Sequence, residues 1–293
     1  MAEAKVFREF TQAELDAEYS PRLTAPDFQS YFDRWAALGV EARKSPRAKL
    51  DVAYGPDPTD KVDIFPPAGD GPHPVLIYFH GGFWRRFGKG DRSFIAPHMN
   101  EAGVMLVSVD YALLPTVTMD DLVAQCRRAV IWIARHIAEF GGDPARLYIA
   151  GESAGGHLTA TMAATDWVAL EGAGSAPSIR GALAISGVYD LEPIPLTYLQ
   201  PEVRLTPEHV ARHSPARHVI KVPTQVILAV GLKESAEFQR QMTDYSAAFV
   251  AAGIRHDLVR CGDRNHFSIL DALCEPRHQL HLALMRLMRP TAR

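Results

Sequence analysis

A single serine stands among small residues at 151–155, in the order Gly-Glu-Ser-Ala-Gly. The apolar run 146–150 precedes this segment and the helical run AGGHLTATMAA follows it. Ser153 therefore falls at a sharp turn from strand to helix, where small neighbours allow strained backbone angles that expose a hydroxyl. Neither G-K-[ST] nor G-x-G-x-x-G spacing is present, so a phosphate-binding or dinucleotide-binding turn is disfavoured. The pattern predicts Ser153 as the nucleophile of an acyl transfer.

A serine nucleophile needs a base, and His266 is the best placed of the 12 histidines. It lies in the segment DRNHFSIL, a predicted loop ahead of a helical run near the C-terminus. The order serine, acid, histidine along the chain is the one expected when the serine occupies this kind of turn. His278 and His281 fall within a predicted C-terminal helix and are read as packed or solvated side chains.

The acid that orients the imidazole is predicted to be Glu234, four residues past the end of the apolar run 225–230. A carboxylate there can fix the histidine tautomer and stabilise its cationic form. Asp190, just past the run 182–186, is the competing candidate. Asp263 is disfavoured because it shares a loop with His266.

An oxyanion hole is predicted from the segment YFHGGFW, which follows a buried strand. Gly81 and Gly82 can present backbone N–H groups, and the Ala154 N–H would complete the set around a tetrahedral intermediate. Phe83 and Trp84 are expected to line the substrate pocket.

Composition and charge disfavour several other classes of protein. A net charge of −3 over 293 residues does not indicate a nucleic-acid partner. The longest apolar runs are too short to span a membrane, and the charged N-terminus lacks the apolar region of a signal peptide. The three cysteines have no paired spacing, which favours reduced thiols and a cytoplasmic location. His209 and His213 lack the glutamate of H-E-x-x-H, so we expect no metal. The predicted serine chemistry also needs no organic cofactor.

Strand-like and helical runs alternate along the chain. We expect strands at 49–54, 61–65, 75–79, 104–109, 146–150, 182–186 and 225–230, and helices at 119–142 and 236–252. This alternation predicts an α/β fold with a mostly parallel central sheet and helices on both faces. The short turn between the first two strands predicts an antiparallel start.

The domain organisation is predicted to be a single domain over residues 1–293. Within residues 1–45, Phe28, Phe32, Trp35 and Leu38 recur at helical spacing, so this segment is expected to pack on the main domain. Residues 190–215 are rich in proline and histidine and form a candidate cap insertion over the pocket.

The combination of HGGFW, GESAGGH and a late NHF resembles the α/β-hydrolase superfamily. The segments ELDAEYSPR, VAYGPDPTDKVDIFPP, SGVYDLEPI and ESAEFQRQ resemble the kynurenine formamidase (arylformamidase) branch over nearly the whole chain. The resemblance implies a triad of Ser153, Glu234 and His266, with Gly81, Gly82 and Ala154 at the oxyanion. One departure is Glu234 in E-S-A-E-F, where the family usually has aspartate in D-S-P-E-F.

The expected function is that of a serine hydrolase that removes a small, formyl-type acyl group from an aryl amide. The alternatives are a short-chain carboxylesterase, a hydrolase of carbamates or other amides, an acyltransferase, and a binding protein that has lost catalysis. The expected partner is a small-molecule amide or ester, and a homodimer is left open.

Overall fold

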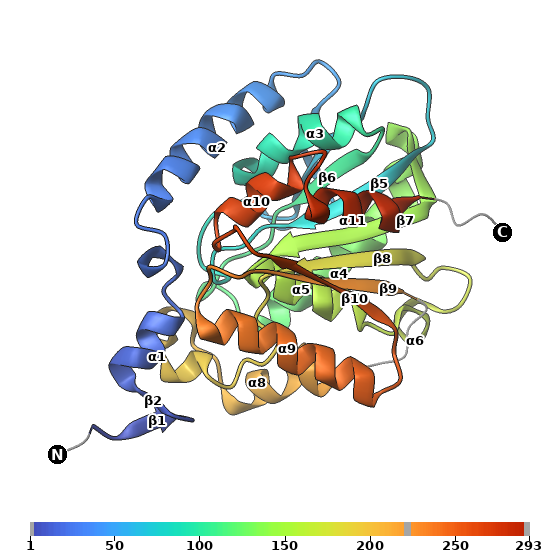
Figure 1. Cartoon of the computed structure of the whole chain (residues 1–293). Helices are drawn as coiled ribbons and strands as arrows, with labels where there is room; N and C mark the ends of the chain where they lie inside the picture. The colour runs from blue at the N-terminus through green and yellow to red at the C-terminus, as the bar shows by residue number, and fades with distance from the viewer. Residues whose placement is uncertain (1–2, 220–223, 290–293) are drawn as a thin grey trace.

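The computed structural model describes residues 3–219 and 224–289. Eight strands form the central sheet in the order β10-β9-β8-β7-β5-β6-β4-β3 (Figure 1). The sheet strands are β3 (Lys49–Ala53), β4 (Lys61–Phe65), β5 (His73–Phe79), β6 (Met105–Val109), β7 (Gly142–Glu152), β8 (Ile179–Ile185), β9 (Gln225–Gly231) and β10 (His256–Cys261). A separate two-stranded sheet pairs β1 (Lys5–Phe7) with β2 (Phe10–Thr11).

The sheet is antiparallel at one edge and parallel elsewhere. β4 pairs antiparallel with both β3 and β6, and the strands from β6 through β5, β7, β8 and β9 to β10 are parallel. This confirms the expected antiparallel start and parallel core. All seven predicted strands are present. The additional strand, β10, lies at one edge of the sheet, and only Val259 and Cys261 of its residues are buried.

The helices are α1 (Gln12–Glu18), α2 (Phe28–Arg43), α3 (Ala96–Glu101), α4 (Met119–His136), α5 (Ala154–Ala163), α6 (Trp167–Glu171), α7 (Gln200–Val203), α8 (Pro207–His213), α9 (Ala236–Ala251), α10 (Ser268–Leu273) and α11 (Gln279–Met288). Short 3-10 helices are η1 (Pro21–Leu23), η2 (Lys89–Ile95), η3 (Ile137–Phe140), η4 (Ile194–Leu196) and η5 (Pro215–Arg217). The predicted helix 119–142 ends earlier, at His136, and continues as η3. Gly141, at φ +84°, then turns the chain into β7.

Helices cover both faces of the sheet. One buried cluster joins one sheet face to α4, α5 and α9, and a second joins the other face to α2, α3, α10 and α11. α2 packs against η2 through the stacked rings of Trp35 and Phe94, whose centroids lie 5.2 Å apart. The predicted N-terminal helix therefore lies against the main body, as Figure 1 shows.

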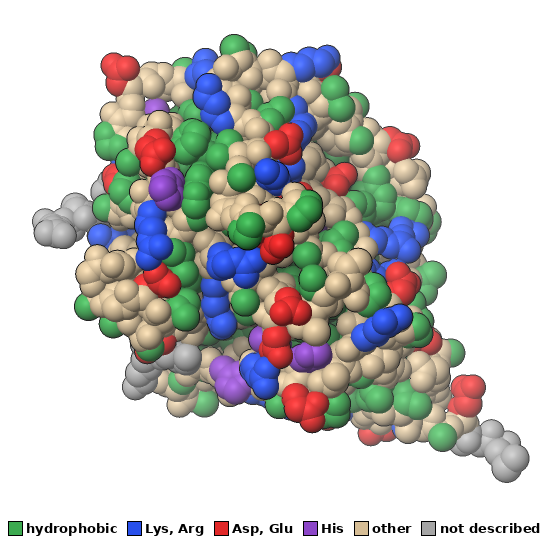
Figure 2. Space-filling view, turned by 180° about the vertical axis from the view of Figure 1, so that it is seen from behind, with side chains coloured by type: hydrophobic (Ala, Val, Ile, Leu, Met, Phe, Trp, Pro, Cys, Tyr) green, Lys and Arg blue, Asp and Glu red, His purple; other side chains and the backbone are tan. Residues whose placement is uncertain are grey.

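Polar contacts attach the N-terminal segment to α9. Arg8 pairs with Asp244, Arg240 bridges Glu237 and Asp244, and the Tyr19 hydroxyl donates to Glu237 at 2.8 Å. Figure 2 shows positive and negative side chains interspersed on the face opposite to the view of Figure 1. None of the helices in the described ranges is both long enough and apolar enough to cross a membrane.

Candidate active site

Ser153 occupies the turn between β7 and α5. Its backbone angles, φ +57° and ψ −120°, lie in a region that a residue with a side chain rarely adopts. Its N–H donates to the Ile185 carbonyl at 2.8 Å, which holds the turn against the end of β8. A Cβ at Gly155 would stand 1.9 Å from the Phe79 carbonyl oxygen, so the turn requires glycine there. The turn has the strained backbone angles that the motif predicts, whereas Ser153 itself is only 4% exposed.

His266 and Glu234 form a buried pair. The imidazole Nδ1 lies 2.6 Å from Glu234 Oε2, and both side chains are almost fully buried. The other carboxylate oxygen accepts from the Ser186 hydroxyl at 2.6 Å and from the Gly231 N–H at 2.7 Å. Since a carboxylate only accepts, Nδ1 of the neutral imidazole carries the proton and Nε2 has the lone pair. This is the tautomer that a general base needs.

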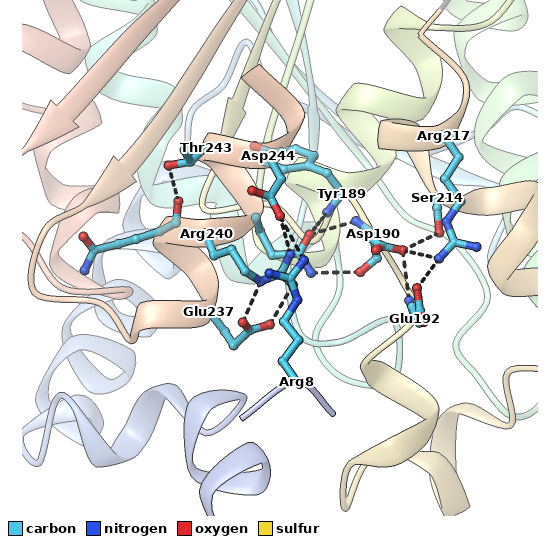
Figure 3. Close-up of polar contacts among 12 residues, drawn as sticks. Arg8, Tyr189, Asp190, Glu192, Ser214, Arg217, Glu237, Arg240, Thr243 and Asp244 are labelled. Atoms are coloured by element: carbon cyan, nitrogen blue, oxygen red, sulfur yellow. Dashed lines mark hydrogen bonds and ion pairs between the residues drawn. The ribbon is translucent and has the colours of Figure 1, made fainter. Parts of the chain in front are cut away.

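The competing acids lie elsewhere. Asp190 accepts from Arg217 at 3.0 Å and Ser214 at 3.4 Å (Figure 3), and it makes no contact with the imidazole among the described residues. Asp263 is mostly exposed and pairs with Arg264 and His278. The position of Glu234 at the end of β9, beside Ser186 at the end of β8, explains why it reaches His266.

Ser153 and His266 line one cavity of about 400 Å³. Aromatic side chains from distant segments form much of its wall, and arginines form another part. The lining residues include Phe32, Trp35, Phe83, Phe87, Phe267, Arg22, Arg85, Arg86, Arg92, Tyr198 and Glu202. Phe32 and Trp35 belong to the apolar stripe of α2, which had been predicted only as packing.

Two predicted residues are placed differently from expectation. The Gly81 N–H donates to Glu152 Oε1 at 2.7 Å, so the carboxylate already occupies this donor. Trp84 does not line the cavity: it is fully buried and its indole N–H donates to His157 at 3.2 Å. Trp84 points inward because of the local backbone. Positive φ angles at Gly82, Phe83 and Trp84 turn the loop toward the interior. Phe83 does line the cavity as predicted.

The amides of Gly82 and Ala154 remain open. Within the described ranges, neither N–H donates to another protein group, and the Phe83 N–H is also without an acceptor. Ala154 is the first residue of α5, where N–H groups have no acceptor within the helix. His80 supports this loop, because its Nδ1 lies 2.8 Å from the Gly81 carbonyl and its ring stacks on Tyr111. Burial lowers the pKa of His80 to about 3, so its imidazole is neutral.

A buried polar group behind the serine was missed by sequence reasoning. Glu152, the second residue of the motif, accepts from Arg92 at 2.7 Å and from the Tyr78 hydroxyl at 2.8 Å, in addition to Gly81. Burial, and then the adjacent carboxylate, raise the pKa of Tyr78 well above its ordinary value, so the phenol stays a donor. The signal available in the sequence was Glu152 itself, a charged residue between the buried end of a strand and the serine.

The residues 3–219 and 224–289 contain no group of three side chains arranged to bind a metal ion. His209 and His213 instead face Asp120, at 3.8 Å and 2.5 Å.

Comparison with known proteins identifies the fold and the family of this chain. Residues 76–211 match a family model described as the alpha/beta hydrolase fold. A solved structure of a candidate thioesterase from Silicibacter sp. tm1040 superposes with a TM-score of 0.80 at 26% identity, covering 94% of this chain and 98% of that one. The carboxylesterase EstE1 gives a TM-score of 0.71 at 19% identity, covering 92% and 98%. The chain is an α/β-hydrolase.

The sequence comparison shows to which family of α/β-hydrolases the chain belongs. The kynurenine formamidase of Danio rerio is 32% identical, over 96% of this chain and 98% of the relative. The kynurenine formamidase of Salmo salar is 31% identical over the same shares of the two chains. The chain belongs to the kynurenine formamidase family, within the α/β-hydrolases.

Proposed function

We propose that this enzyme removes the formyl group from an aryl formamide of the kynurenine type, with Ser153 as nucleophile, His266 as base and Glu234 as the orienting acid. The observation that carries the proposal is the Glu234–His266 pair, whose imidazole lines one aromatic-walled cavity together with the strained serine. The near full-length similarity to two kynurenine formamidases supports the choice of substrate.

The reaction begins when His266 Nε2 takes the Ser153 proton as the hydroxyl attacks the formyl carbon. Negative charge develops on the carbonyl oxygen, and we propose that the N–H groups of Gly82 and Ala154 stabilise it. The Phe83 N–H is the next open donor and would replace that of Gly81, which is bound to Glu152. Each donor of this kind contributes roughly 3 kcal/mol to transition-state stabilisation.

The tetrahedral intermediate collapses as His266 gives its proton to the aryl amine, which leaves. A water molecule then attacks the formyl ester on Ser153, with His266 again as base, and formate is released. The aromatic walls from Phe32, Trp35, Phe87 and Phe267 suit an aryl leaving group. We propose residues 190–215 as the cap of this cavity, because Tyr198 and Glu202 line it.

The proposal also covers the partner of the enzyme and its location in the cell. A small molecule fits the cavity volume, and a nucleic acid is not the expected partner. The free thiols of Cys126, Cys261 and Cys274 suit the reducing cytoplasm.

The test is a comparison of kcat/KM for N-formylkynurenine, a short p-nitrophenyl ester and an aryl carbamate. We expect the formamide to be the best substrate by at least about tenfold. Ser153→Ala should lower turnover of every substrate by about 10⁴-fold or more while leaving the melting temperature nearly unchanged. Ester hydrolysis without formamide hydrolysis would instead support the carboxylesterase alternative, whose fold this chain shares.

A further inference from the structure

Arg85 has an unusual position in the cavity wall. Its side chain is only 8% exposed, and it lines the same cavity as Ser153 and His266. One terminal nitrogen, Nη1, pairs with Glu202 of α7. The Nε atom is buried and, among the described residues, has no hydrogen-bond partner. Leaving a buried donor of a charged group unpaired is costly, so this atom is a candidate for a ligand contact.

The charge of the cavity wall points to the kind of ligand. Arg92 is already balanced by Glu152, and Arg85 shares Glu202, whose side chain is 52% exposed. Arg22 and Arg86 also line the cavity and pair with no carboxylate in the described part of the chain. The lining thus holds four arginines and two glutamates, and this excess of positive charge attracts an anionic substrate.

Resting on the proposed function, we propose that Arg85 binds a carboxylate carried by the substrate, so that the enzyme selects aryl formamides with an acidic side chain. The guanidinium presents its N–H groups as a planar fork that matches a carboxylate in two-point contact. Glu202 competes for that fork in the free enzyme. Because Glu202 is half exposed, it can turn toward solvent when the substrate carboxylate arrives.

Arg85 and Glu202 should therefore have opposite effects on selectivity. The probes are a formanilide bearing a short aliphatic carboxylate and the same compound as its neutral primary amide. The measured quantity is the ratio of the two kcat/KM values. In the unmodified enzyme we expect the acid to be preferred by about 10–100-fold, mainly through a lower KM.

Arg85→Gln should bring this ratio close to one, because the charged fork is lost. Glu202→Gln should raise the ratio, because the competing carboxylate is lost. If the Arg85–Glu202 pair only holds the loop against α7, the two variants should behave alike. Breaking the ion pair from either side would then change the kinetics in the same direction. The matched control is Arg135→Gln, which breaks an Arg–Glu pair away from the cavity and should leave the ratio unchanged.

Three outcomes would overturn the proposal: no preference for the acid in the unmodified enzyme, an unchanged ratio in Arg85→Gln, or the same direction of change in Arg85→Gln and Glu202→Gln. Failure of the proposed function is distinguishable from these. If the formanilides are not hydrolysed but phenyl acetates are, the formamidase assignment fails. The acid and amide forms of the phenyl acetate then test Arg85 independently.

Discussion

At the scale of residues, two buried glutamates near Ser153 and His266 have different tasks. Glu234 faces His266 and is held by Ser186 and Gly231. Glu152 faces Arg92 and Gly81, behind the serine. The first sets the proton position on the base, and the second fixes the loop that carries the open amides. Both carboxylates are buried, and each is satisfied by three donors, as buried charges require.

The Glu234→Gln variant tests the first of these roles. An amide at this position can donate to Nδ1, which favours the tautomer with its proton on Nε2 and removes the lone pair that the base needs. We expect kcat to fall by about 10⁴-fold. Glu234→Asp keeps a carboxylate and should retain much more activity than Glu234→Gln. If Asp190→Asn is the more damaging change in steady-state kinetics, the acid has been misassigned.

At the scale of elements, the start of α9 is the link between the N-terminal segment and the triad acid. α9 begins two residues after Glu234, and Ser235 donates to the Glu18 carbonyl at 2.7 Å. Tyr19 donates to Glu237 in the first turn of α9. Arg8 reaches Asp244 on the same helix, as Figure 3 shows. The N-terminal segment therefore supports the loop that positions the acid, although it is far from it in sequence.

The Tyr19→Phe variant measures that support. It leaves the buried Glu237 without one donor, while Arg240 remains bound to it. We expect the free energy of unfolding to fall by about 1–3 kcal/mol, seen as a lower urea midpoint with unchanged slope. Tyr148→Phe is the matched control, since its hydroxyl makes only a long 3.5 Å contact. Equal losses in the two variants would show that the Tyr19–Glu237 contact does not support α9.

At the scale of the whole molecule, neutral buried histidines make the free energy of unfolding depend on pH. The Trp84 indole can only donate, so Nδ1 of His157 accepts and its Nε2–H donates to the His213 carbonyl at 2.7 Å. Burial lowers the pKa of His157 from its ordinary 6.5 to about 3, as it does for His80. Between these pH values the unfolded chain binds a proton that the folded chain excludes, so stability rises with pH.

The stability contributed by these neutral histidines is therefore complete above about pH 6.5 and is lost as the pH falls toward 3. Each should add about 1.4 kcal/mol of unfolding free energy per pH unit in that window. His157→Gln, which keeps an acceptor and a donor, should reduce the slope by about that amount in urea titrations between about pH 4 and 6. The His136→Gln variant, at a position whose side chain is 42% exposed, serves as the control. An unaltered slope in His157→Gln would contradict the buried neutral tautomer.

The sequence by itself determined the features that depend on local backbone geometry. The glycines around Ser153 leave no room for side chains, and the buried runs define strands whose order along the chain places serine, acid and base at one end of a parallel sheet. The aromatic stripe of α2 likewise follows from helical spacing, although its contribution to the cavity wall does not.

Only the tertiary structure decided which side chains meet. Glu234 rather than Asp190 reaches His266 because β8 and β9 are neighbours and their ends supply Ser186 and Gly231 as donors. Three elements meet the 81–85 loop and fix its residues. Glu152 of β7 accepts from the Gly81 amide, and His157 of α5 accepts from the inward-facing Trp84. Glu202 of α7 pairs with Arg85. These contacts join positions that are 71 to 117 residues apart in the chain, and no local pattern encodes such pairings.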